Sequence, residues 1–359
     1  MKKIFLFLSL ITIITFVGCQ KDDNNTSTQS HESNIQVEMP RFLTAQGGKI
    51  YATCYNPCCV IRIDTATLKV EAMCKLGKYH PEGLCALGNK LYVTSGSISD
   101  ESSIYSYDNK IYVVDIASFS IVDSILTGYN PERIAALDNN RIIVSYRGDY
   151  ASNPEGTDII DVHTKNATTL SIPIYKFDFY QGNIYGYTVA YDASWNVTNK
   201  FYRIDANSLE HTEILTNFTA ADHAYGMNVN PNNGDLIIMT DGNYIGAGDA
   251  YIYHNDGTLR CNAKEMTTMP SKAVAIDNNT LMILCEGSWG YNDSDISIYN
   301  FTNNTVVNNA FALTNGRGLG DVGQDILLYG NKIYTTVTFS NTIEVIERSS
   351  EPRSMQILL

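Results

Sequence analysis

The sequence repeats itself at intervals of 41 to 52 residues. The stretch KYHPEGLCALGNKLYVTS at 78–95 returns as GYNPERIAALDNNRIIVS at 128–145, with Tyr, Pro, Glu, Ala, Leu and Asn in matching places. Seven times along the chain, an apolar residue follows a turn rich in Asn and Gly: Ile50, Leu91, Ile142, Ile184, Leu236, Leu281 and Ile333. A period of this length predicts seven similar supersecondary units.

Each unit contains short alternating runs rich in Tyr, Val and Ile, which favour β-strands. The second unit divides into four of them, PEGLCAL, KLYVTSG, KIYVVDI and SIVDSIL, and no long helical period follows Val17. Seven units of four strands predict an all-β fold, a seven-bladed β-propeller over residues 34–359. Two segments are candidates for the last outer strand, NIQVE at 34–38 and RSMQILL at 353–359.

The two ends of such a disc differ in composition. Turns between first and second strands are tight Asn/Gly pairs such as Gly88-Asn89, as hairpins require. At the opposite end, the connections between second and third strands, predicted for example at 96–109 and 190–199, are long and rich in Tyr, and they carry both tryptophans. Aromatic side chains with a polar tip are typical of binding surfaces, so we expect a ligand at this second end.

The candidate ligand-binding residues belong to the connections at that end. Pro81 and Pro131 shape the turns into the inner strands, and Glu82, Glu132 and Arg133 are expected to face the central funnel. The full set of candidates is Tyr55, Tyr79, His80, Glu82, Tyr129, Arg133, Arg147, Tyr150, Trp195, His223, Tyr225, Tyr244, Lys272, Trp289, Tyr291 and Arg317.

The start of the chain is typical of an exported lipoprotein. Residues 1–18 contain Lys2, Lys3 and an apolar run, and are predicted to be a signal peptide. Gly18-Cys19 resembles the lipoprotein box that directs cleavage and lipidation at Cys19. The polar stretch 19–33 is predicted to be a flexible tether, and its CQKDD run is similar to the tag that displays lipoproteins of Bacteroidota on the outer membrane.

Charge and cysteine content exclude some functions. Loss of two lysines with the signal changes the net charge from -13 to -15, which argues against a nucleic-acid partner. Seven cysteines remain, and TCYNPCC at 53–59 offers three of them without a fourth ligand at zinc spacing, so no metal site is expected. A disulfide within this stretch, and calcium at Asp293 and Asp295 or at Asp100 and Glu101, remain as alternatives.

Enzyme signatures are mostly missing. The sequence contains no sialidase-type Ser-x-Asp-x-Gly-x-x-Trp box, no G-x-S-x-G nucleophile elbow and no Trp repeat that would hold a quinone. The chain is therefore expected not to be an enzyme. A hydrolase that uses Glu82 or Glu132 is the exception that the residues leave open.

The first three units carry a family resemblance. GGKIYATCYNPCCVIRIDTATLKVEAMCKLGKYHPEGLCALGNKLYVTSG, followed by NKIYVVDIASFSIVDSILTGYNPERIAAL, resembles the YncE-like seven-bladed propellers among surface lipoproteins of Bacteroidota, and within them the BtuG type. The resemblance implies capture of cobalamin or a related corrinoid without catalysis, and handover to a BtuB-like TonB-dependent outer-membrane transporter. It implies no catalytic cofactor, and it makes His80 and His223 candidates for contact near the cobalt. The alternative is a glycan- or protein-binding scaffold of a surface nutrient-uptake complex, with sugars stacked on Trp195 and Trp289.

Overall fold

The computed structural model describes residues 35–99, 105–194, 196–216, 218, 223–244, 246–348 and 354–358. The predicted signal peptide, Cys19, the tether and Trp195 lie outside the described residues. Residues 35–359 form one compact unit. No described helix is both long enough and apolar enough to cross a membrane.

The described chain folds into seven four-stranded antiparallel sheets, each built from four consecutive strands. The first four blades contain β1 (Glu38–Gln46), β2 (Lys49–Asn56), β3 (Cys59–Asp64), β4 (Val70–Lys75); β5 (Pro81–Leu87), β6 (Lys90–Ser99), β7 (Tyr105–Asp115), β8 (Ser120–Leu126); β9 (Pro131–Ala136), β10 (Arg141–Tyr146), β11 (Gly156–Asp161), β12 (Ala167–Thr169); and β13 (Lys176–Tyr180), β14 (Asn183–Tyr191), β15 (Val197–Asp205), β16 (His211–Ile214).

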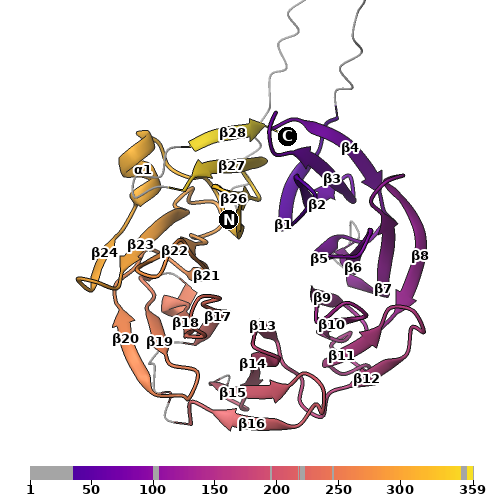
Figure 1. The fold of residues 1–359 in the computed structure, drawn as a ribbon, viewed down its shortest axis with the longest axis horizontal. Coiled ribbons are helices and arrows are strands. Elements are labelled where there is room, and N and C mark those ends of the chain that lie inside the picture. Colours follow the sequence, from indigo (N-terminus) through magenta and orange to yellow (C-terminus); the bar gives the residue numbers. More distant parts are fainter. Residues whose placement is uncertain are drawn as a thin grey trace, which may run out of the picture. The chain divides into compact units, whose positions relative to one another are not determined.

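The remaining three blades contain β17 (Ala224–Val229), β18 (Leu236–Thr240), β19 (Ala250–Tyr253), β20 (Leu259–Ala263); β21 (Pro270–Ala275), β22 (Thr280–Cys285), β23 (Asp295–Asn300), β24 (Thr305–Val307); and β25 (Gly323–Tyr329), β26 (Lys332–Val337), β27 (Thr342–Glu347), β28 (Ser354–Leu358). Two short helices, η1 (Gly242–Tyr244) and α1 (Ala310–Asn315), lie in connections. Figure 1 shows the blades in a ring with their first strands innermost. The seven-bladed β-propeller predicted from the repeat is confirmed.

The core lies between neighbouring blades and is centred on the second strands. All seven anchor residues of the repeat are fully buried: Ile50, Leu91, Ile142, Ile184, Leu236, Leu281 and Ile333. A second strand has a blade packed on each of its two faces, which explains why its apolar residues run almost continuously. The anchors recur because each blade must fill the same wedge between its neighbours.

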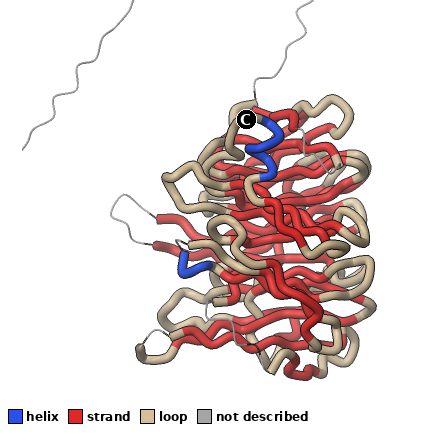
Figure 2. The backbone as a smooth tube through the Cα atoms, turned by 90° about the vertical axis from the view of Figure 1, so that its left-hand side faces the viewer, coloured by secondary structure: helices blue, strands red, loops and turns tan. Residues whose placement is uncertain are grey.

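Strands extend further at one end than the sequence predicts. Two of the strands predicted in the second unit match β5 and β8 over their whole length, but β6 continues to Ser99 and β7 begins at Tyr105. Much of the loop predicted at 96–109 is therefore strand, because Ile98 and Tyr107 continue the ladder. In the same way, β14 and β15 shorten the loop predicted at 190–199. Figure 2 shows a projecting strand pair and η1 at the left end of the disc.

The ring closes without exchange of strands between its ends. The C-terminal segment supplies the outer strand β28, so the second of the two predicted alternatives for closure is correct. At the seam, Thr338 Oγ1 donates to the Pro40 carbonyl at 2.9 Å, and the Leu43 amide donates to Asp325 Oδ2 at 2.8 Å. The first and last blades are therefore joined by side chains that reach backbone groups, together with a shared apolar cluster.

Candidate functional site

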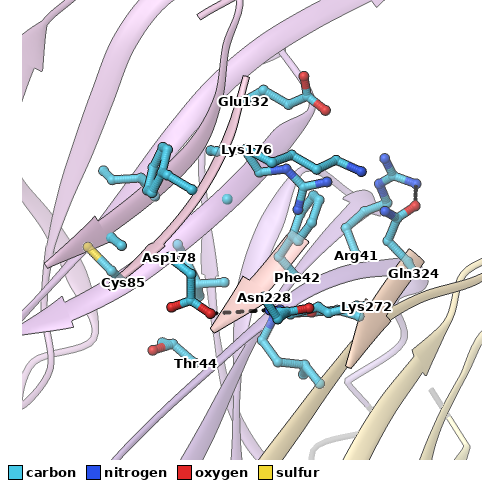
Figure 3. A pocket seen from close by; sticks show the side chains of 18 of the residues that line it. Arg41, Phe42, Thr44, Cys85, Glu132, Lys176, Asp178, Asn228, Lys272 and Gln324 are labelled. Carbon is cyan, nitrogen blue, oxygen red and sulfur yellow. Dashed lines mark hydrogen bonds and ion pairs between the residues drawn. The ribbon is translucent and has the colours of Figure 1, made fainter. Parts of the chain in front are cut away.

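The innermost strands enclose a cavity of about 580 Å³ along the axis of the propeller. Its walls carry four cationic and four anionic side chains: Arg41, Arg133, Lys176 and Lys272, with Glu132, Asp178, Glu286 and Asp325. Figure 3 shows several of them projecting into the cavity from different strands. A polar cavity with balanced charge suits a polar ligand better than a purely apolar one.

A ring of β-bulges directs side chains into one end of this channel. In six blades the inner strand carries an extra residue near its start, and the register with the second strand shifts there; the extra residue follows Pro40 in β1 and the first residue of the strand in the other five. A bulge changes the direction of the side chain that it carries, and bulges are common beside functional sites. The residues at these bulges are Arg41, Glu82, Glu132, Tyr225, Ser271 and Gln324.

Arg41 organises one cluster in this ring. Its guanidinium lies 3.3 Å from Glu82 Oε2, lies 4.9 Å from the centre of the Tyr55 ring, and donates to Gln324. The Tyr55 hydroxyl donates to Glu82, and the Tyr55 ring stacks on His80 with 4.2 Å between the ring centres. Burial raises the pKa of Glu82 although Arg41 opposes this, and burial together with Arg41 lowers the pKa of His80. The cluster is therefore dense in polar groups but poorly hydrated.

Cations gather on the third and fourth blades. The Arg133 guanidinium lies 4.4 Å from the centre of the Phe42 ring, and Arg147 lies 4.4 Å from that of Tyr175. Lys176 lines the channel and is half-buried, and burial and the nearby Arg133 lower its pKa to about 7. Such a pKa lets a lysine change its charge near neutral pH.

Other charged groups of the channel are paired. The Tyr225 hydroxyl donates to Glu286 Oε2 at 2.7 Å, and Lys272 forms an ion pair with Asp325. Asp178 Oδ2 accepts from the Val229 amide at 2.9 Å. These contacts connect neighbouring blades, so they hold the shape of the channel.

Exposed aromatic residues surround the same end of the propeller. All eight exposed Tyr, Trp and Phe side chains of the described chain lie in connections, or at strand ends, on the side where the inner strands begin. We call this set the aromatic rim: Tyr105, Tyr129, Tyr150, Tyr191, Tyr244, Trp289, Tyr291 and Phe339. By contrast, several exposed aliphatic residues, such as Val122, Leu259 and Val307, lie on outer strands. The rim is thus a property of one end of the disc and not of the whole surface.

The structure brings many of the sequence-predicted residues together and separates others. Three of them line the channel, Arg133, Tyr225 and Lys272. Four others are linked to its lining by contacts: Tyr55 and Glu82 with Arg41, His80 with Tyr55, and Arg147 with Tyr175. Five belong to the aromatic rim: Tyr129, Tyr150, Tyr244, Trp289 and Tyr291.

Three candidates have local roles. Tyr79 is half-buried beneath the Lys78 ammonium at 4.9 Å, and His223 lies between the Tyr244 ring and Asp241, with its Nδ1 3.1 Å from Asp241 Oδ2. Arg317 lies apart from the channel walls and pairs with the buried Glu344 at 2.8 Å.

Sequence reasoning missed several residues that line the channel. They are Arg41, Phe42, Tyr175, Lys176, Glu286, Gln324 and Asp325. Glu82 and Glu132 were found because a proline precedes each in a recognisable repeat. Arg41 also follows a proline, Pro40, so an alignment of the first three units on this proline would have found it.

The alternatives for metal binding and disulfides have structural outcomes, except for calcium at Asp100 and Glu101, which lie outside the described residues. All seven cysteines of the described chain are free thiols. Asp295, a calcium candidate, instead accepts from the amides of Phe311 at 3.0 Å and Ala312 at 3.2 Å. No group of three metal-ligating side chains is found among the residues that the structure describes.

Comparison with known proteins defines the class. The sequence matches no family model and no curated protein. Among solved structures, it is similar to the hydrazine synthase of Kuenenia stuttgartiensis, with a TM-score of 0.65 and 16% identity over 90% of this chain and 99% of that chain. It is also similar to the computationally designed protein Ika8, with a TM-score of 0.55 and 10% identity over 85% of this chain and 82% of that chain. At these identities the likeness shows the fold alone, and the protein is a seven-bladed β-propeller.

Proposed function

We propose that this protein is a cell-surface lipoprotein that captures cobalamin or a related corrinoid at the aromatic rim. The ligand is then passed to a BtuB-like TonB-dependent outer-membrane transporter. The observation that carries the proposal is the aromatic rim itself, eight exposed rings gathered around the mouth of a polar channel. The proposal assigns no reaction to the protein and treats the corrinoid as cargo.

The chemistry of a corrinoid fits such a surface. The corrin is broad, with apolar faces and a rim of amides, so it needs flat ring contacts together with hydrogen-bond donors and acceptors. Rim tyrosines supply both, and Arg41, Glu82 and Gln324 lie at the neighbouring bulges. Because antiparallel blades hold the loop ends in place, little ordering entropy opposes binding.

Location at the cell surface rests on the sequence alone. The lipoprotein box at Gly18-Cys19, the acidic tether and the YncE-like repeat support it. Radiolabelled palmitate incorporation by the full-length chain, compared with the Cys19→Ala variant, tests the anchor. Incorporation that persists in the variant would contradict lipidation at Cys19.

The proposed function is tested by calorimetry with residues 34–359 and cyanocobalamin. We expect one-to-one binding, weakened about 10- to 100-fold by Trp289→Ala or Tyr291→Ala, because aromatic anchors carry much of the free energy of binding. Both side chains are highly exposed, at 73% and 78%, so neither substitution should lower Tm. Val122→Ala is the matched control, since Val122 is also exposed but lies on the outer strand β8.

The alternative function is glycan binding by a scaffold of a nutrient-uptake complex. The high exposure of Trp289 favours it, because an exposed indole stacks well on a sugar face. No heat of binding with micromolar cyanocobalamin would exclude the corrinoid proposal. Glycan binding that is lost in Trp289→Ala but retained in Val122→Ala would then support the alternative.

A further inference from the structure

The four cations in the channel walls fall into two classes. Arg41 pairs with Glu82, and Lys272 pairs with Asp325. Arg133 and Lys176 form no ion pair with any carboxylate among the residues that the structure describes. Two cations therefore line the cavity without a counter-ion within pairing distance.

Both unpaired cations are held in place by aromatic rings. Arg133 lies 4.4 Å from the centre of the Phe42 ring, and its Nε is buried without a hydrogen-bond partner. Lys176 Nζ donates to the Tyr225 carbonyl and lies 4.4 Å from the centre of the Tyr225 ring. Ring contacts fix the position of a cation but leave N–H groups available, and a buried donor without an acceptor is costly.

The charges that act on Lys176 have both signs. Arg133 and Arg147 oppose its protonation, whereas Glu286 and Glu132 favour it. Burial opposes the charge of Arg133 and Glu132 favours it, and Glu286 already accepts a hydrogen bond from Tyr225. An anion placed here would offset the repulsion between Arg133 and Lys176.

We propose that Arg133 and Lys176 form an anion subsite inside the channel, which binds a carboxylate or phosphate group of a small molecule. The guanidinium supplies a planar pair of donors and the ammonium a point charge, a combination suited to an oxyanion. The cavity of about 580 Å³ has room for a small organic anion. This subsite lies in the channel, and its existence does not depend on corrinoid capture at the rim.

The test uses two probes, sulfate for a tetrahedral oxyanion and acetate for a carboxylate, with calorimetry on residues 34–359. We expect at least one probe to bind, and Arg133→Met or Lys176→Met to weaken it by at least about tenfold, because each removes a charge-assisted hydrogen bond. Sulfate binding alone points to a phosphate group, and acetate binding alone to a carboxylate. Lys165→Met is the control, since it changes the net charge equally but removes an exposed ion pair with Asp123.

The pH dependence separates a direct role of Lys176 from a structural one. Because burial and Arg133 lower its pKa to about 7, binding of sulfate, whose charge is constant, should weaken between about pH 6 and pH 8.5. Anion binding near neutral pH should take up protons, which calorimetry in two buffers of different ionisation enthalpy measures. Lys176→Arg should bind the probe without this proton uptake.

Three results would overturn the proposal. The first is an absence of binding by both probes at tens of millimolar, roughly the weakest affinity worth assigning to a site. The second is weakening of binding in Lys165→Met equal to that in the two channel variants. The third is proton uptake that persists in Lys176→Met. Thermal unfolding of each variant checks its fold, and if Arg133→Met does not fold, the two Lys176 variants decide the matter.

Discussion

Carboxylates in the turns and in the channel of the propeller behave in opposite ways. Where third strands turn into fourth strands, an aspartate accepts hydrogen bonds from amides two or three residues further on, as Asp161 Oδ1 does from Thr164 at 2.7 Å. Hydrogen bonds of this kind lower the pKa of Asp115, Asp161 and Asp205, and the pKa of Asp64 is lowered by Lys49 together with such bonds. In the channel, burial raises the pKa of Glu82 and Asp178.

This difference separates carboxylates that stabilise the turns from carboxylates that belong to the candidate binding site. At the turns, the fold stabilises each negative charge in contact with water, so the aspartates support the hairpins. In the channel, the protein holds charges that burial disfavours, an arrangement typical of functional sites. We therefore expect different effects on stability when a turn carboxylate and a channel carboxylate are replaced.

The largest effect is expected for Asp325→Ala in the channel. Asp325 is 1% exposed, accepts from the amides of Leu43 at 2.8 Å and Ile326 at 3.0 Å, and pairs with Lys272. Its removal leaves the buried Leu43 and Ile326 amides without this acceptor and the partly exposed Lys272 without its counter-ion, at a cost of about 2–5 kcal/mol. Urea unfolding measures this loss, and Asp325→Asn, which keeps an acceptor, should lose less. If Asp325→Ala loses no more stability than a substitution of a turn aspartate does, the contrast between turn and channel carboxylates does not hold.

The strands could be predicted from the sequence, but only some of the residues that form the channel could. The spacing of Ile50, Leu91 and the other anchors reflects burial between blades, a constraint that every blade shares. Channel residues share a position but not a residue type, since the bulges carry Arg41 in one blade and Ser271 in another. The direction in which a bulge turns a side chain depends on the shifted register. Neither this direction nor the choice of closing strand can be predicted from the alternation of apolar and polar residues alone.

Two glycines extend the comparison to the backbone. A Cβ on Gly226, in the inner strand β17, would lie 2.1 Å from the Ser271 carbonyl oxygen of the next blade. Gly88, in a turn at the other end, has open space around it but a φ of +61°. We expect Gly226→Ala to cost about 1–3 kcal/mol or more, because the neighbouring backbone must move.

Gly88→Ala should cost only about 1 kcal/mol, the strain of a left-handed conformation. Urea unfolding of both variants checks the order. If Gly88→Ala is the more destabilising of the two, the inner strands are less tightly packed than the structure indicates. Binding of cyanocobalamin by the Gly88→Ala variant should be unchanged, because this turn lies at the end opposite the rim.

The smallest effect is expected at the turns and depends on pH. The Ser118 amide and hydroxyl donate to Asp115 and lower its pKa, so its charge stabilises the fold above the unfolded pKa of about 3.9. This contribution is lost as pH falls through the lower, folded pKa. Asp115→Asn keeps an acceptor but not the charge, so it should lower Tm by no more than about 2 °C at pH 7.

The difference between wild type and Asp115→Asn should disappear below about pH 3, which thermal unfolding from pH 7 to pH 2 can measure. Asp178 supplies the matched test in the channel, since its pKa is raised by burial and the sign therefore reverses. Wild type should gain stability relative to Asp178→Asn as pH falls from the raised, folded pKa toward about 3.9. If both differences change in the same direction with pH, turn and channel carboxylates are not held in opposite ways.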